Sequence, residues 1–195
     1  MISGDIIKYG QLDNVQKDEA VEVFLEGFGH MMTFSKNKQD LKDLFSAAFH
    51  PEYIYTYLEN GIVLGILGIA TNHIRPIKFD LNQCVKTLGK QKGYIVCKQI
   101  NLIFQSQAVK KETDIYIDVL ATTKSARGKG IATKLLEYAF ALPRYKEYYI
   151  EVLSKNQNAK RLYEKKGFVA YKRNYVSFIN LMGFGYPIKM KRNMT

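Results

Sequence analysis

A glycine-rich, basic turn at residues 127–132 has the residue types and spacing to bind a diphosphate. Its sequence is Arg-Gly-Lys-Gly-Ile-Ala, between an apolar run and an amphipathic one. Glycine has no Cβ, so the backbone can bend tightly and approach a ligand closely. The first N–H groups of a helix that begins at such a turn have no intrahelical acceptor, and the helix dipole favours an anion. Arg127, Lys129 and Lys134 add positive charge, and the simplest ligand that fits is a pyrophosphate.

The elements that must position this turn follow from apolar spacing and turn residues. Helices are expected at 13–28, 39–49, 128–142 and 156–166, and the stretches 79–89 and 94–104 are each compatible with a helix. Strands are expected at 6–9, 53–58, 62–71, 114–122, 148–153, 168–178 and 187–191. The turn therefore connects the 114–122 strand to the helix that follows it.

Length and composition predict a single cytoplasmic domain over residues 1–195. The chain has 195 residues, 47% hydrophobic and 24% charged, and no repeat or Pro/Ser-rich linker, which excludes a disordered chain and argues against two domains. Cys84 and Cys97 form no Cys-x-x-Cys motif and point to a reducing compartment, and no metal is expected. We see no signal-peptide pattern, and the longest apolar stretch, 61–70, is too short for a bilayer, so no membrane partner is expected.

The excess positive charge lies in the part of the chain that contains the turn. Residues 1–110 hold 12 Lys and Arg against 11 Asp and Glu, whereas residues 111–195 hold 17 against 7. The positive potential of this part would attract a small polyanion, and it would also attract RNA. The charge distribution alone therefore does not choose between these two ligands. A third interpretation is that the excess positive charge only keeps the protein soluble.

Two common nucleotide motifs do not fit the turn. A phosphate-binding Gly-x4-Gly-Lys-Ser/Thr string is absent. A Gly-x-Gly-x-x-Gly fingerprint lacks its third glycine, because Thr133 stands there, although Glu151 falls near the expected acidic position. Too few elements follow for a complete dinucleotide-binding domain.

The turn resembles the Arg/Gln-x-x-Gly-x-Gly/Ala signature of the GNAT superfamily, the acyl-CoA-dependent N-acyltransferases. The strand at 114–122 precedes it as that family expects. Downstream, residues 151–168 resemble the family's strand followed by Asn-x-x-Ala-x-x-x-Tyr-Glu-x-x-Gly-Phe, with Asn156, Ala159, Tyr163, Gly167 and Phe168 at the matching positions. The resemblance covers residues 114–168 well.

The resemblance implies an α/β (α+β) fold whose mixed, mostly antiparallel central sheet splays open at its centre and is flanked by helices. Acetyl-CoA would lie where the sheet opens, with its pyrophosphate on the backbone of the turn and its pantetheine along the 120–122 edge, and the Thr122 N–H would face the thioester carbonyl. The implied acetyl-CoA-binding residues are Leu120, Ala121, Thr122, Arg127, Gly128, Lys129, Gly130, Ile131, Ala132, Asn156 and Tyr163.

The implied reaction is attack of a neutral amine on the thioester, in which the amine loses a proton and the thiolate gains one. Tyr163 occupies the family position of the general acid, although packing under its helix is the alternative reading. We predict Asp118, an acid in an otherwise apolar strand, as the base. An ion pair would explain Asp118 equally well, and Glu151 or a water chain could serve instead.

The acceptor amine is not identified by the sequence. It could belong to a small molecule or a peptide, and an insertion at about 73–112 could be a substrate lid, a dimer element or decoration. A homodimer is left open. Two other functions remain: a non-catalytic acyl-CoA-binding domain, and a basic nucleic-acid-binding module, which ranks last because no RNA motif or recognition helix stands out.

Overall fold

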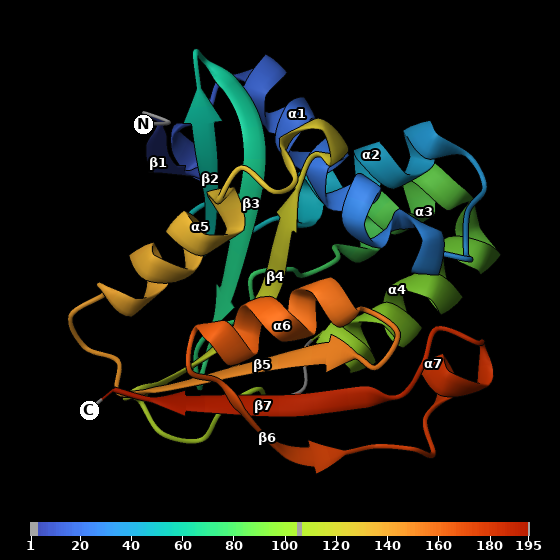
Figure 1. The fold of residues 1–195 in the computed structure, drawn as a ribbon. Helices are drawn as coiled ribbons and strands as arrows, with labels where there is room; N and C mark the ends of the chain where they lie inside the picture. Colours follow the sequence, from blue (N-terminus) through green and yellow to red (C-terminus); the bar gives the residue numbers. More distant parts are fainter. Residues whose placement is uncertain (1–3, 105–106, 195) are drawn as a thin grey trace.

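A single seven-stranded sheet organises this computed structural model, which describes residues 4–104 and 107–194. The strand order is β1-β2-β3-β4-β5-β7-β6 (Figure 1). Only β4 and β5 run parallel among the described strand pairs. The strands are β1 (Asp5–Lys8), β2 (Ile54–Glu59), β3 (Ile62–Ala70), β4 (Asp114–Thr122), β5 (Glu147–Leu153), β6 (Val169–Arg173) and β7 (Pro187–Asn193). The predicted mixed, mostly antiparallel sheet with flanking helices is confirmed.

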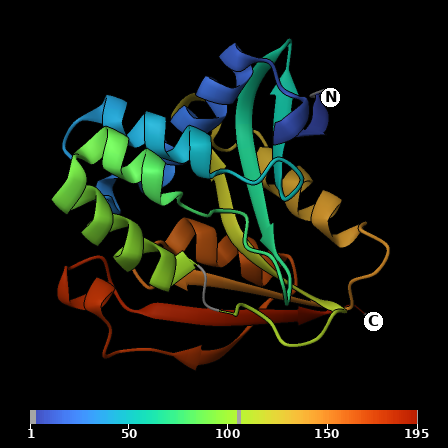
Figure 2. The ribbon, with the colours of Figure 1, turned by 180° about the vertical axis from the view of Figure 1, so that it is seen from behind.

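Helices cover both faces of the sheet, and each face has its own core (Figures 1 and 2). The α1–α4 core includes Phe24, Phe45 and Val119, and the α5–α6 core includes Leu135, Tyr163 and Ile117. The helices are α1 (Asn14–Phe28), α2 (Lys38–Ala48), α3 (Leu81–Leu88), α4 (Lys90–Phe104), α5 (Ile131–Phe140), α6 (Gln157–Lys165) and α7 (Phe178–Leu181).

The sheet opens at its centre, between its two parallel strands. Backbone pairing of β4 with β5 ends at Ile117 and Ile150, and in the described chain the strands do not pair beyond this point. We call this place the split. On its other edge β4 remains paired with β3 as far as Thr122. Residues 118–122 of β4 therefore have one edge without a strand partner, as the resemblance implied.

A β-bulge lies at the head of the split. Gly68 pairs with Val119 and Ile69 pairs with Ile117, so Asp118 is the extra residue. Alternate residues of a regular strand share a face, yet Ile117 belongs to the α5–α6 core and Val119 to the α1–α4 core. The bulge thus shifts the alternation by one residue, and bulges commonly redirect a side chain next to a functional site.

The insertion folds as a helical hairpin that packs against α2 through α3 (Figure 2). Both compatible helices are present, although α4 begins at Lys90, four residues before the expected start. The Asn101 side chain fixes the hairpin: its Nδ2 donates to the Phe79 carbonyl at 2.9 Å, and its Oδ1 accepts from the Phe79 N–H at 3.0 Å. Over residues 4–104 and 107–194 no helix has both the length and the apolarity of a membrane span.

One predicted strand was too long. β6 ends at Arg173 and not at 178, and the chain continues through a loop into α7. The Ser177 Oγ accepts the Asn180 N–H at 3.2 Å, and the Asn180 Nδ2 donates to the Tyr175 carbonyl at 2.7 Å. These local bonds give the backbone an alternative to a sheet ladder, which is why the strand stops.

Candidate active site

In the glycine-rich turn the N–H groups of Arg127 and Lys129 donate to the Lys124 and Ala126 carbonyls at 3.4 and 3.3 Å, so the donors left for a ligand are the first N–H groups of α5, which have no intrahelical acceptor. Gly128 and Gly130 have φ angles of +79° and +82°, in the left-handed region that favours glycine. Gly130 is the N-cap of α5, which therefore begins at Ile131 and not at 128 as expected, and no side chain caps this end. The first turn of α5 contains no acidic residue, and Arg127 and Lys129 are exposed. This geometry suits an anion with several oxygens, such as a diphosphate.

Contacts from neighbouring elements hold the turn in place. The Lys124 N–H donates to Glu26 Oε2 of α1 at 2.7 Å, and the Thr123 N–H donates to the Leu64 carbonyl at 3.0 Å. Ile131 is buried, and a Cβ on Gly65 of β3 would lie only 2.7 Å from its Cγ2. Because Gly65 has no side chain, α5 packs closely on β3, and this packing fixes the position of the turn from which α5 begins.

Tyr163 projects from α6 into the α5–α6 core. Its side chain is 6% exposed, and its ring centroid lies 6.0 Å from that of Phe168. Burial raises the pKa of Tyr163 well above its ordinary value of about 10. Among the described residues its hydroxyl makes no hydrogen bond. Tyr163 is therefore protonated at neutral pH.

Asn156 caps α6, the helix that carries Tyr163. Its Oδ1 accepts the Ala159 N–H at 3.2 Å. The sequence-based prediction gave this side chain a second role on a pantetheine amide, and that role stays a prediction. The two roles are separable by mutation.

We expect Asn156→Ala to lower the free energy of unfolding by about 1 kcal/mol, because an orphan N–H of α6 loses its acceptor. It should also raise the KM for acetyl-CoA. Asn37 is the control: its Oδ1 accepts the Gln39 N–H of α2 at 2.9 Å and its Nδ2 donates to Asp40 Oδ1 at 3.0 Å, so Asn37→Ala should destabilise at least as much without affecting KM. Urea unfolding and steady-state kinetics measure both effects. An unchanged KM for N156A would leave Asn156 as a cap only.

Asp118, the predicted base, is held by an arginine that sequence reasoning missed. Arg75 Nε donates to Asp118 Oδ2 at 3.0 Å, and Arg75 Nη2 donates to Oδ1 and Oδ2 at 2.9 Å each. The two side chains are only 11% and 8% exposed. Burial raises the pKa of Asp118, and the Arg75 guanidinium opposes that rise. The two residues are 43 positions apart, and no local pattern links them.

Glu151 and Tyr116 share the face of the sheet on which this ion pair lies. Glu151 directly follows Ile150, the last residue of β5 that pairs with β4. Its neighbours Ile150 and Val152 both belong to the α5–α6 core. Its side chain is therefore on the α1–α4 face. The pKa of Glu151 is raised by burial and also by the charge of Asp118, whereas Lys189 lowers it. Tyr116, which sequence reasoning did not single out, has the Arg75 guanidinium 5.9 Å from its ring.

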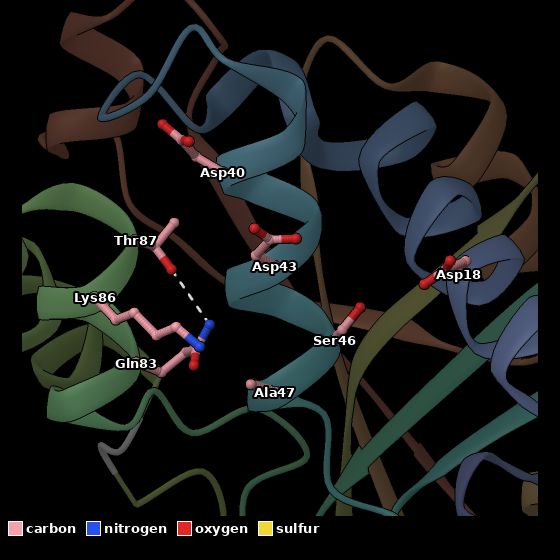
Figure 3. A pocket seen from close by; sticks show the side chains of 8 residues that line it. All are labelled: Asp18, Asp40, Asp43, Ser46, Ala47, Gln83, Lys86 and Thr87. Atoms are coloured by element: carbon pink, nitrogen blue, oxygen red, sulfur yellow. Dashed lines mark hydrogen bonds between the residues drawn. The ribbon is translucent and has the colours of Figure 1, made fainter.

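A separate pocket of about 760 Å³ lies between α1, α2 and α3 (Figure 3). It contains none of the predicted site residues, and it is lined by Asp18, Asp40, Asp43, Ser46, Ala47, Gln83, Lys86 and Thr87. On the wall formed by α3, Gln83 Nε2 donates a hydrogen bond of 3.3 Å to Thr87 Oγ1. Within the described residues no group of three or more His, Cys, Asp and Glu side chains could hold a metal ion.

Comparison with known proteins identifies a family for residues 21–168, which match the model of the acetyltransferase (GNAT) family. The chain is 34% identical over 93 residues to N-alpha-acetyltransferase 30 of Schizosaccharomyces pombe, covering 45% of this chain and 57% of the relative. The aligned segment is thus less than two thirds of that protein's length.

Solved structures share the fold at low sequence identity. An N-acetyltransferase from Staphylococcus aureus Mu50 superposes with a TM-score of 0.63 at 18% identity, over 96% of this chain and 99% of the other. The NatC complex bound to Gag peptide and CoA contains a chain that superposes with a TM-score of 0.55 at 18% identity, over 99% of each chain. At these identities the likeness concerns the fold.

Proposed function

Because the chain belongs to the GNAT acetyltransferase family, whose members use acetyl-CoA, we propose that it transfers the acetyl group of acetyl-CoA to the α-amine of a peptide. One observation carries the proposal: β4 loses its β5 partner beyond Ile117, with the buried Asp118 carboxylate at that point and the glycine-rich turn after the free edge, while Tyr163 lies in the α5–α6 core. The choice of a peptide rests on the 34% identity to an N-alpha-acetyltransferase.

The donor would lie along the free edge of β4. The N–H groups of the first turn of α5 fit a diphosphate, with the exposed side chains of Arg127 and Lys129 beside it. The backbone of Leu120, Ala121 and Thr122 would pair with the pantetheine amides as an added strand, because that edge has no strand partner in the described chain. The Thr122 N–H would stabilise the oxyanion.

The two proton transfers would occur on opposite faces of the sheet. Tyr163 belongs to the α5–α6 core, whereas Asp118 pairs with an arginine on the α1–α4 face. An amine entering from the α1–α4 face meets Asp118, and the sulfur leaves towards Tyr163.

The reaction balances with these two groups. The amine nitrogen forms a bond to the thioester carbon and gives one proton to the Asp118 carboxylate. The carbon–sulfur bond breaks, and the thiolate takes the proton of the Tyr163 hydroxyl. Solvent then carries the proton from Asp118 back to the tyrosinate, leaving an acetamide and free CoA. An α-amine suits this chemistry, because its pKa near 8 leaves more of it neutral at pH 7 than a lysine amine has.

We test the proposal by incubating the protein with acetyl-CoA and peptides that have a free N-terminus. We expect release of the CoA thiol together with one acetyl group on the N-terminal nitrogen, located by mass spectrometry. Matched peptides with a blocked N-terminus and an internal lysine should react much more slowly. Binding of acetyl-CoA without transfer to any amine would instead favour a non-catalytic domain.

A further inference from the structure

The insertion between β3 and β4 places an arginine at the head of the split. Arg75 lies just after β3, and its backbone is fixed on both sides. The Thr71 N–H donates to the Ile74 carbonyl at 2.8 Å before it, and the His50 N–H donates to the Pro76 carbonyl at 2.9 Å after it. A side chain on such an anchored segment reaches its target with little freedom, which is what an orienting group requires.

Arg75 engages Asp118 in a way that a lysine could not reproduce. Its planar guanidinium contacts both carboxylate oxygens through three hydrogen bonds of 2.9–3.0 Å, so the carboxylate has one fixed plane. Asp118 is also the extra residue of the bulge, so its backbone has moved out of the regular ladder with β3. Backbone and side chain are thus both fixed at the residue where the two parallel strands part.

We propose that Arg75 is a positioning residue for acetyl transfer, which holds the Asp118 carboxylate ionised and in one orientation at the head of the split. The inference rests on the proposed function and extends it to the insertion. A carboxylate that is only 8% exposed would become neutral if it had no cationic partner, and a neutral carboxylic acid cannot accept the amine's proton. Arg75 therefore supplies the charge that keeps the base in its working form.

The other charged and titratable groups near Asp118 do not replace Arg75. Tyr116 on β4 and Tyr171 on β6 are neutral at pH 7, because burial raises the pKa of each. Glu151 on β5 carries the same sign of charge as Asp118. Lys189 on β7 acts on Glu151, to which it is the cross-strand neighbour.

The test compares the pH dependence of kcat/KM for the wild-type protein, Arg75→Met and Asp118→Asn. Without the guanidinium the pKa of Asp118 rises, so its ionised form is lost at a higher pH. We expect the acid limb of the R75M profile to move up by about 1–3 pH units, with activity recovering at high pH. D118N should lower kcat by about 100-fold or more at every pH at which Asp118 of the wild-type protein is ionised. Lys8→Met removes the ion pair between Lys8 of β1 and Glu52, and it should leave the pH profile of kcat/KM unchanged.

A double-mutant cycle keeps the test decisive if R75M does not fold, as circular dichroism would reveal. R75K should lower kcat several-fold when Asp118 is present and add nothing in the D118N background. Equal effects in both backgrounds, an unshifted R75M profile, or a D118N variant with wild-type kcat would each overturn the inference and leave the proposed function standing. Loss of kcat in E151Q with wild-type kcat in D118N would move the base to Glu151. A wild-type protein that acetylates no amine overturns both.

Discussion

Replacement of Gly128 and Gly130 together by valine should abolish measurable acetyl-CoA binding. Both glycines have a positive φ, which a β-branched residue rarely adopts, so the turn must rearrange. The side chains would also fill the space next to the N–H groups that we propose to bind the diphosphate. Loss of two hydrogen bonds to a charged group corresponds to a fall in affinity of at least about 100-fold. Isothermal titration calorimetry with acetyl-CoA measures it.

Gly61 provides a matched control for backbone strain. Its φ is also +79°, and a Cβ added there, as at Gly128 or Gly130, would meet no atom within 4 Å. It lies in the turn between β2 and β3, at the far end of the hairpin from the residues that begin the insertion. Gly61→Val should therefore carry a similar conformational cost for each substituted residue and leave the affinity for acetyl-CoA unchanged. An unaltered affinity in G128V/G130V would contradict the assignment of the donor site.

The turn could be predicted from the sequence because its geometry is determined locally. The positive φ of the two glycines and the capping of α6 by Asn156 each depend on residues within a few positions, although α5 begins at Ile131 and not at the expected residue 128. The opening of the sheet at its centre followed from the resemblance of residues 114–168. Local pattern and family resemblance together were enough for the fold, whereas the place where the donor would bind stays a prediction.

The surroundings of Asp118 could not be predicted in the same way. The bulge appears only when β4 pairs with β3, and Arg75 reaches the carboxylate across a long insertion. Both depend on tertiary packing, which leaves no periodic pattern in the sequence.

The overlong strand predicted at 168–178 has a related cause. Val176 and Phe178 favour strands, yet they are 97% and 75% exposed, and strand propensity depends on a neighbouring surface that these residues lack.

Tyr163→Phe should reduce kcat strongly while leaving the protein as stable as the wild type. The substitution removes only the hydroxyl oxygen, which bonds no other described residue, so the folded state loses no internal hydrogen bond. The departing thiolate then lacks its proton donor, and kcat should fall by about 100-fold or more. The KM for acetyl-CoA should change little. Stopped-flow detection of free CoA and thermal unfolding measure the two quantities.

The pH dependence of the wild-type enzyme should agree with this role. A general acid works while it is protonated, and burial raises the pKa of Tyr163, so its donor form persists through neutral pH and is lost only as the pH rises through that raised value. Any alkaline limb from Tyr163 should therefore lie above about pH 10, the ordinary pKa of the side chain.

Tyr148 separates loss of catalysis from loss of packing. It is fully buried in the same α5–α6 core, and its hydroxyl donates to the carbonyls of Phe140 and Tyr145 at 3.3 Å each. Tyr148→Phe should therefore lower the free energy of unfolding by about 1 kcal/mol and keep kcat. Tyr163→Phe should do the reverse, because its hydroxyl serves the leaving group and not the fold. If both variants kept kcat, the acid would have to be solvent, and Tyr163 would act only in packing.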